Sequence, residues 1–282
     1  MKFIVLDTPA FNIDGGAYFG VVPKIIWEKK YPANEHNMCK AACRSLLFDD
    51  GEHIILVDTG IGDKPEDDKP DLYFTDYSHN LLQNIKNAGY SCNDITDVIL
   101  THLHFDHCGG TTRFCKENGK FVLNFPNAKH YVSKQQWESA FNPNYREKSS
   151  FDTKKISILE QEGNLILVDK HQSIGKYTEL LFFNGHTDGL MLPLFNAEGF
   201  SLFFAGDLIP AIASVPLAWI SAYDIRPLVS IEEKQKLLKL AADNKWIMFF
   251  QHDYYNQCCR IVATDRGYRA TDSFNLVDFL NE

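Results

Sequence analysis

The sequence predicts an α/β fold in which sheets and helices form separate layers. Short apolar, β-branched runs bounded by turn residues recur along the 282 residues, and each has the length of a strand. Longer segments between some of these runs place their apolar side chains on one helical face. The chain has no internal repeat, low-complexity tract or Pro/Gly/Ser linker, so one domain over residues 1–282 is expected.

The expected strands combine β-branched and aromatic residues over lengths too short for a buried helix. They cover residues 3–6, 53–57, 98–100, 165–168, 179–183, 201–205 and 246–250. Three expected helices cover residues 81–88 before the stop signal Gly89, residues 134–140 behind a Ser133 cap, and residues 231–244 behind Ser230. The acidic segment at residues 67–75 is expected to be a surface loop.

Composition and charge argue against several classes of protein. The net charge is −9 and no long run of Lys and Arg occurs, which argues against a nucleic-acid partner. No stretch approaches the ~20 apolar residues of a membrane span, and the apolar run at residues 1–6 is too short for a signal peptide. The 7 cysteines are an odd number, which without a secretion signal predicts reduced thiols in a cytoplasmic protein.

The segment at residues 12–32 is unusual because glycines at its start are followed by aromatic and apolar residues. One interpretation is an N-terminal hairpin that packs on the core. The other is a loop that lines a pocket or a subunit contact, with Phe19 and Trp27 as candidate pocket walls. A homodimer through this segment is therefore expected as one possible assembly.

The decisive segment is THLHFDHCGG, at residues 101–110. In an extended stretch, His102, His104 and Asp106 alternate and leave the same side of the backbone. His107 is offset by one residue and faces differently, as a second metal position requires. Imidazole nitrogen and carboxylate oxygen are the ligands that a zinc-like cation prefers. Three histidines and one aspartate within six residues therefore indicate a metal site.

Three later residues also follow strand-like runs. His186 lies in FFNGHTDG, Asp207 in FFAGD and His252 in MFFQHD. Strand ends hold side chains on rigid elements, which suits a site that needs fixed geometry. Each signal is weak by itself, but together with the first segment they indicate one metal centre.

The order HxHxDH, then GH, then GD, then H resembles the metallo-β-lactamase superfamily over essentially the whole chain. The resemblance implies a four-layer αβ/βα sandwich with two divalent metal ions at one edge between two sheets. The first implied ligand set is His102, His104 and His186, and the second is Asp106, His107 and His252. Asp207 would bridge the two ions, while Asp58 would support the metal loop without binding metal.

The implied cofactors are two zinc ions, although manganese, iron or cobalt fit similar nitrogen and oxygen ligands. The remaining histidines match no ligand position and are expected to be structural or surface residues. They are His36, His53, His79, His130 and His171.

Within the superfamily, the chain resembles the YtnP-type quorum-quenching lactonases, the N-acyl-homoserine lactone hydrolases and methyl parathion hydrolase. The resemblance is carried by DGGAYFGVVPKIIWEKKY at residues 14–31, by THLHFDH, and by the turn from Asp207 to Pro210. Many acyl-homoserine lactonases place a substrate-contacting tyrosine three residues after the bridging aspartate. Here that position is Pro210, so the hydroxyl must come from elsewhere or be absent.

The resemblance implies hydrolysis of a small-molecule lactone or ester by a metal-activated water. Asp106 is expected to pass a proton to the leaving alkoxide, and the alternative is that it only binds metal. Phe105 joins Phe19 and Trp27 as an expected wall for an apolar acyl chain. The competing hypotheses are a phosphotriesterase or arylesterase of the same fold and a catalytically idle metal-binding protein.

Overall fold

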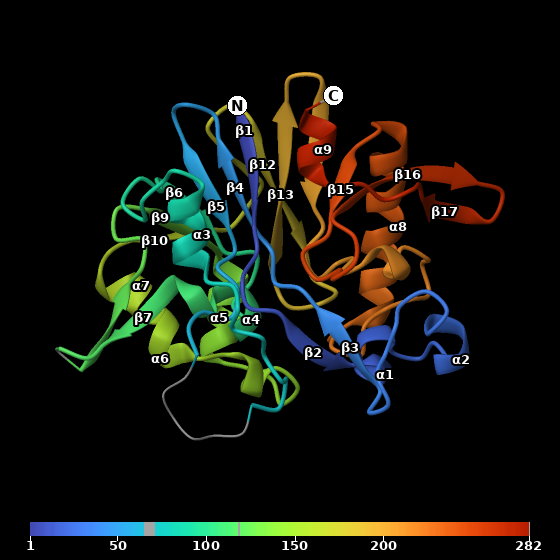
Figure 1. Cartoon of the computed structure of the whole chain (residues 1–282), viewed down its shortest axis with the longest axis horizontal. Coiled ribbons are helices and arrows are strands. Elements are labelled where there is room, and N and C mark those ends of the chain that lie inside the picture. The colour runs from blue at the N-terminus through green and yellow to red at the C-terminus, as the bar shows by residue number, and fades with distance from the viewer. Residues whose placement is uncertain (65–70, 118, 282) are drawn as a thin grey trace.

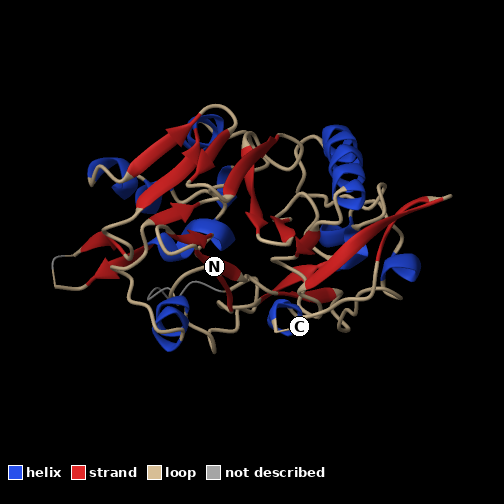
Figure 2. Cartoon of the chain, turned by 90° about the horizontal axis from the view of Figure 1, so that it is seen from above, coloured by secondary structure: helices blue, strands red, loops and turns tan. Residues whose placement is uncertain are grey.

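Two large β-sheets face each other, and helices cover their outer faces (Figures 1 and 2). The computed structural model describes residues 1–64, 71–117 and 119–281, so the loop expected at residues 67–75 is described only from residue 71 onward. The first sheet runs in the order β1 (Lys2–Leu6), β4 (Ser45–Asp49), β5 (Ile54–Val57), β6 (Asp97–Ile99), β9 (Lys129–Ser133) and β10 (Leu165–Val168). The second runs in the order β11 (Gln172–Ile174), β12 (Thr178–Phe183), β13 (Leu190–Ala197), β14 (Phe200–Phe204), β15 (Ile247–Phe249), β16 (Cys258–Thr264) and β17 (Gly267–Ala270).

Two small strand pairs and a set of mostly short helices complete the described chain. The pairs are β2 (Phe11–Asp14) with β3 (Met38–Ala41), and β7 (Thr112–Cys115) with β8 (Lys120–Leu123). The helices are α1 (Gly15–Phe19), α2 (Lys24–Trp27), α3 (Leu81–Asn87), α4 (Phe105–Cys108), α5 (Lys134–Phe141), α6 (Thr153–Ile156), α7 (Ile158–Gln161), α8 (Pro227–Asp243) and α9 (Leu276–Leu280).

The alternation of side chains along the strands builds the layers. In β4, Leu46 and Phe48 enter the core between the two sheets, whereas Leu47 packs on the outer face in the cluster that includes α3. In β14, Phe204 enters the same inner core, whereas Phe203 faces the cluster that includes α8. The predicted four-layer αβ/βα sandwich is therefore the observed fold.

All seven expected strands are present, with ends shifted by a residue or two, and two of the three expected helices begin as predicted. The Ser133 side chain caps α5 by accepting a hydrogen bond from the backbone of Gln136. The prediction for α8 was wrong at its start, because the helix begins at Pro227, a residue that suits the first helical turn. Ser230 therefore lies inside the helix, where its hydroxyl donates to Asp224.

The structure bears on the cysteines and on the helices as follows. All seven cysteines are free. Across the described residues, no helix has both the length and the apolar character needed to cross a bilayer. The cytoplasmic location stays a prediction.

A buried lysine in α8 holds the segment that leads from β14 toward the helix. Lys234 is fully buried, and its ammonium group donates hydrogen bonds of 2.9 Å to the carbonyl oxygens of Pro216 and Trp219. Burial lowers the pKa of Lys234 to about 7, although the nearby Asp224 carboxylate acts in the opposite direction. The lysine thus fixes the chain just before Asp224, whose carboxylate pairs with His186.

The buried lysine predicts a specific dependence of stability on pH. An unfolded lysine has a pKa of about 10.4, so between about pH 7 and that value the unfolded chain binds a proton that the folded protein does not. The contribution of Lys234 to the free energy of unfolding therefore rises with pH across this window and is constant below it. Urea unfolding at several pH values should show a steeper rise for the wild type than for Lys234→Met. The exposed Lys239→Met on the same helix is the control, and parallel curves for the wild type and Lys234→Met would contradict the prediction.

Candidate metal centre

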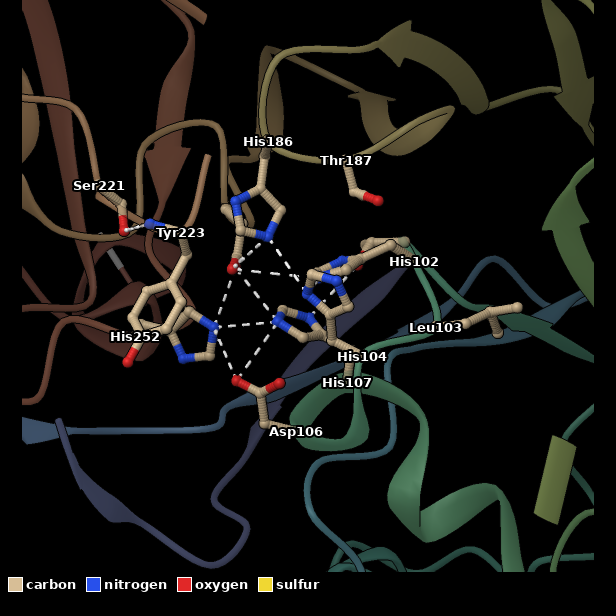
Figure 3. A network of polar contacts seen from close by, with 12 residues as sticks. His102, Leu103, His104, Asp106, His107, His186, Thr187, Ser221, Tyr223 and His252 are labelled. Atoms are coloured by element: carbon tan, nitrogen blue, oxygen red, sulfur yellow. Dashed lines mark hydrogen bonds and ion pairs between the residues drawn. The ribbon is translucent and has the colours of Figure 1, made fainter. Parts of the chain in front are cut away.

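The predicted ligands come together at one edge of the sandwich, where strands of both sheets end (Figure 3). His102 follows β6, while His186, Asp207 and His252 follow β12, β14 and β15. β14 and β15 are parallel, and β12 runs in the same direction because it is separated from β14 by the antiparallel β13. The carboxyl ends of these strands therefore deliver three candidate ligands to one place.

The first group of donor atoms comes from the first predicted ligand set. The Nε2 atom of His102 lies 3.0 Å from Nδ1 of His104, which lies 3.4 Å from Nε2 of His186. The Oδ2 atom of Asp207 lies 3.2 Å from His186 Nε2 and 4.0 Å from His102 Nε2. Ligand atoms around a tetrahedral zinc lie about 3.3 Å apart. The group has the dimensions of one metal site.

The second group lies on the other side of Asp207. The Nε2 atoms of His107 and His252 are 3.1 Å apart, and Asp106 Oδ2 lies 3.7 and 3.8 Å from them. The Oδ1 atom of Asp207 lies 3.2 Å from the first nitrogen and 2.9 Å from the second. Asp207 thus presents one oxygen to each group, which is the geometry of a bridging carboxylate.

Each ligand histidine engages a fixed partner through its second ring nitrogen. The pairs are His102 Nδ1 with Thr101 Oγ1 (3.1 Å), His104 Nε2 with Glu147 Oε1 (3.3 Å), His107 Nδ1 with Asp58 Oδ2 (2.8 Å), His186 Nδ1 with Asp224 Oδ1 (3.0 Å) and His252 Nδ1 with the Ala42 carbonyl (2.7 Å). A neutral imidazole that donates through one nitrogen carries a lone pair on the other. Lone pairs and carboxylate oxygens at these distances repel unless a proton or a metal ion lies between them. The donor set therefore fits two divalent cations.

The electrostatics of the site also favour bound cations. Burial lowers the pKa of His102 and of His104, which keeps both rings neutral and able to act as ligands. Burial acts in the same direction on His107, but the carboxylates of Asp207, Asp106 and Asp58 raise its pKa to about 10. The same three carboxylates would attract a metal ion to this position.

Asp58 has the supporting position that was predicted for it. The residue is fully buried and adopts a left-handed backbone conformation with φ of 55°. Its carboxylate accepts hydrogen bonds of 2.8 Å from the backbone and the hydroxyl of Thr101, and it pairs with His107 at the same distance. A strained non-glycine residue of this kind persists where its surroundings fix it strongly. Asp58 orients His107 directly and His102 through Thr101.

The local geometry of the motif differs from the predicted extended stretch. The extended backbone ends at His104, and residues Phe105–Cys108 form the helical turn α4. Asp106 therefore does not share a side with His102 and His104, but joins His107 in the second group. The glycines after the motif allow close packing as well as a turn, because a Cβ on Gly109 would lie 2.0 Å from the Ile61 carbonyl oxygen.

A cavity opens above the two groups of donor atoms, with about 720 Å³ of empty space when the part open to solvent is included. Its walls come from the N-terminal segment, α4 and the loops near residues 146–150 and 210–223. The lining residues include Phe11, Ile13, Tyr73, Phe105, Arg146 and Tyr223. Glu147, Asp224, Arg146 and Tyr223 were not found from the sequence. Nothing in their local pattern marks them, because they meet the motif only through the fold.

The prediction for Phe19 and Trp27 was wrong, whereas Phe105 does line the cavity. Phe19 and Trp27 are 0% and 1% exposed and stack on each other with ring centroids 5.0 Å apart. In the described chain they belong to a buried cluster behind the cavity wall, where a neighbouring residue of the same segment, Tyr18, reaches the cavity instead. Aromatic side chains in a glycine-rich segment are equally suited to core packing, and the sequence did not separate the two.

Both interpretations of residues 12–32 hold in part. The strand pair β2–β3 packs on the core, while Ile13 and Tyr18 line the cavity. On the outside of the same segment, Val21, Ile25 and Ile26 are 92%, 74% and 50% exposed. The subunit contact expected here stays a prediction.

The fold and the donor set together are those of a metal-dependent hydrolase. Residues 41–252 match the family model of the metallo-beta-lactamase superfamily, so the chain belongs to this superfamily. The match includes every predicted metal ligand.

Two solved structures are similar over nearly the full chain. A probable metal-dependent hydrolase from Staphylococcus aureus is 28% identical, with a TM-score of 0.85 and coverage of 97% of this chain and 98% of that one. AidC, a dizinc quorum-quenching lactonase solved with a product, is 22% identical, with a TM-score of 0.79 and coverage of 97% and 95%. At that identity the second comparison shows the fold alone.

A curated relative matches over a shorter stretch. The N-acyl homoserine lactonase AttM of Agrobacterium fabrum is 32% identical over 77 residues, which are 27% of this chain. The matched stretch spans only 25% of the length of that lactonase. The local match therefore supports the superfamily and leaves the activity of the whole protein to be proposed.

The partner of His104 gives a test of the first metal site. Glu147 is 2% exposed, and its carboxylate also accepts hydrogen bonds from Thr187 and Asn144. We expect Glu147→Gln to weaken one of two metal sites about 10–100-fold, because His104 loses a charged partner. Metal content measured during titration with a chelator checks this. Glu138→Gln on the exposed side of α5 is the control, and equal weakening of both sites would contradict the assignment.

Proposed function

We propose that the protein is a binuclear metal-dependent hydrolase that opens lactone rings, with N-acyl-homoserine lactone-like compounds as the first candidate substrates. The observation that carries this proposal is the position of Asp207, whose two oxygens face two different groups of donor atoms. A bridging carboxylate of this kind suits a pair of metal ions that share a water. Zinc is the proposed metal, because the site is dominated by imidazole nitrogen.

The protein groups divide the chemistry between them. When bound, the two cations would supply Lewis acidity and lower the pKa of a water toward neutrality. Asp106 lines the cavity and lies beside His107 and His252, so its carboxylate is placed to pass a proton to the leaving alkoxide. The alternative, in which Asp106 acts only as a ligand, uses the same position.

The walls of the cavity support an apolar acyl substituent. Phe11, Ile13 and Phe105 line it, and the ring of Tyr73 packs on Phe105 with centroids 5.2 Å apart. The guanidinium of Arg146 donates to the Ala222 carbonyl beside the cavity, which puts a polar group near one wall. Apolar walls with few polar groups are typical of small-molecule sites. The local similarity to AttM, which is described as an N-acyl homoserine lactonase, supports the same substrate class.

A substrate panel tests the proposal against its rivals. The protein would be loaded with zinc, its metal content measured, and kcat/KM determined for acyl-homoserine lactones, simple lactones, aryl esters and phosphotriesters. We expect the highest kcat/KM for a lactone and loss of activity on chelation. Higher efficiency on phosphotriesters or aryl esters would replace the lactonase with the first rival. Two bound metals with no hydrolysis of any substrate would favour an idle metal-binding protein.

Tyr223 is the proposed replacement for the hydroxyl that Pro210 cannot supply. Both residues line the cavity. Burial, with the Tyr73 phenol and the Asp106 carboxylate nearby, raises the pKa of Tyr223 to about 12, so the phenol keeps its proton at neutral pH. Tyr18, which also lines the cavity, already donates to the His252 carbonyl at 3.4 Å.

Removal of the Tyr223 hydroxyl should therefore affect the chemical step. We expect Tyr223→Phe to lower kcat about 10²-fold with a smaller change in KM, because a donor to the developing oxyanion is lost. Steady-state kinetics on the best lactone measure this. Tyr255→Phe, on a half-exposed tyrosine outside the cavity lining, is the control. A change in KM alone would show that Tyr223 only helps to bind the substrate.

A further inference from the structure

A cysteine lies against the second group of donor atoms. Cys43 is 1% exposed, and its sulfur, a carboxylate oxygen of Asp106 and a ring nitrogen of His252 all lie within 4.8 Å of one another. Cys43 is not among the described residues that line the cavity, so it reaches the group from the protein interior. A thiol is thus present where the superfamily pattern found in the sequence has only nitrogen and oxygen donors.

The backbone around Cys43 is fixed to the same histidine that it approaches. The Ala42 backbone N–H donates to the His252 carbonyl at 3.2 Å, and the His252 ring donates to the Ala42 carbonyl at 2.7 Å. On the other side, the Arg44 N–H donates to the Gln251 carbonyl at 3.2 Å. Cys43 sits between these two anchored residues. Its position relative to His252 is therefore set by the backbone rather than by a mobile side chain.

We propose that Cys43 is an additional ligand of the second metal ion, beside Asp106, His107, Asp207 and His252. The inference rests on the binuclear centre proposed above. On metal binding the thiol loses its proton to solvent, and the thiolate sulfur donates an electron pair to the metal at about 2.3 Å for zinc. No oxidant or reductant takes part.

A sulfur ligand has consequences for the choice of metal. Thiolate favours zinc over manganese, whereas a site of only imidazole and carboxylate accepts either more evenly. The first group, built from His102, His104 and His186, has no sulfur in the described chain. The two sites are therefore expected to differ in metal preference, with the second more selective for zinc or cobalt.

Cys108 provides a matched control. It is also buried, and it follows the ligand His107 directly in the sequence. Its thiol donates instead to the Leu103 carbonyl at 3.4 Å, and it belongs to none of the donor groups found in the described residues. Cys43 and Cys108 are thus both buried near the site, but only Cys43 faces the metal position.

The experiment uses the full protein loaded with cobalt. We expect a near-ultraviolet sulfur-to-cobalt charge-transfer band in the wild type and in Cys108→Ser, and loss of this band in Cys43→Ser. Chelator titration should release the second metal from Cys43→Ser at a concentration at least about tenfold lower than from the wild type. A band that persists in Cys43→Ser would overturn the assignment.

X-ray absorption on the zinc-loaded wild type keeps the test independent of whether a variant folds. A sulfur scatterer at about 2.3 Å from zinc supports the proposal. Two bound zinc ions with only nitrogen and oxygen neighbours would refute the role of Cys43 while leaving the binuclear centre in place. Failure to bind two metal ions at all would refute both.

Discussion

The negative charge of the Asp207 carboxylate is the interaction on which the rest of this site depends. It stands between two groups of imidazole nitrogens, with one oxygen 3.2 Å from His186 and the other 2.9 Å from His252. Burial opposes its charge, but the histidines around it lower its pKa well below the usual range, so it stays ionised. Protonated imidazoles or bound metal cations can each stabilise this ionised, buried carboxylate, and two divalent cations would replace the protons when metal binds. The requirement for positive charge around this site therefore follows from the position of one side chain.

The fold supplies that position through strand direction. β14 and β15 are parallel, so Asp207 and His252 leave the sheet at the same edge. β5 and β6 are parallel in the opposing sheet, which brings Asp58 next to Thr101 and the motif that follows. Antiparallel neighbours would have sent these residues to opposite edges. The site therefore depends on the inner core between the sheets, which holds the two sets of strand ends in register.

Residues that do not bind metal but hold the ligand histidines, here called outer partners, extend the site far beyond its ligands. The second nitrogen of each ligand histidine is held by a residue outside the ligand set, such as the Ala42 carbonyl for His252 and Asp224 for His186. Asp224 is in turn held by Ser230, and Lys234 on the same helix fixes the preceding loop. Ring orientations are thus set before any metal binds, which lowers the entropy cost of binding. α8 acts on the metal centre without contacting it.

The sequence predicted the parts of this structure that depend on local pattern. Strands such as β14 are short apolar runs because both faces of the sheet are buried, and the density of His and Asp in residues 101–110 is typical of a metal site. Of the outer partners, Asp58 was implied by the resemblance, whereas Glu147 could not be predicted because it lies more than 40 residues from His104 and meets it only in the fold. Phe19 and Trp27 were misassigned for a related reason: composition indicates that aromatic side chains are buried, but not whether core or cavity surrounds them.

The floor of the cavity, which carries the metal ligands, and its walls, which would contact a substrate, come from different parts of the fold. The floor comes from segments that directly follow strand ends and from the helical turn α4, so a shift of strand register by one residue would displace the ligands that follow. The walls come from loops and from the N-terminal segment, which tolerate change more readily, except at residues such as Glu147 that hold a ligand histidine. Pro210 and Tyr223 both belong to the walls, so the proposed transfer of the hydroxyl from one loop to another would leave the ligands in place. Under the proposed function, substrate choice would therefore be a property of the loops, whereas the metal ligands depend on the sheets and on α4.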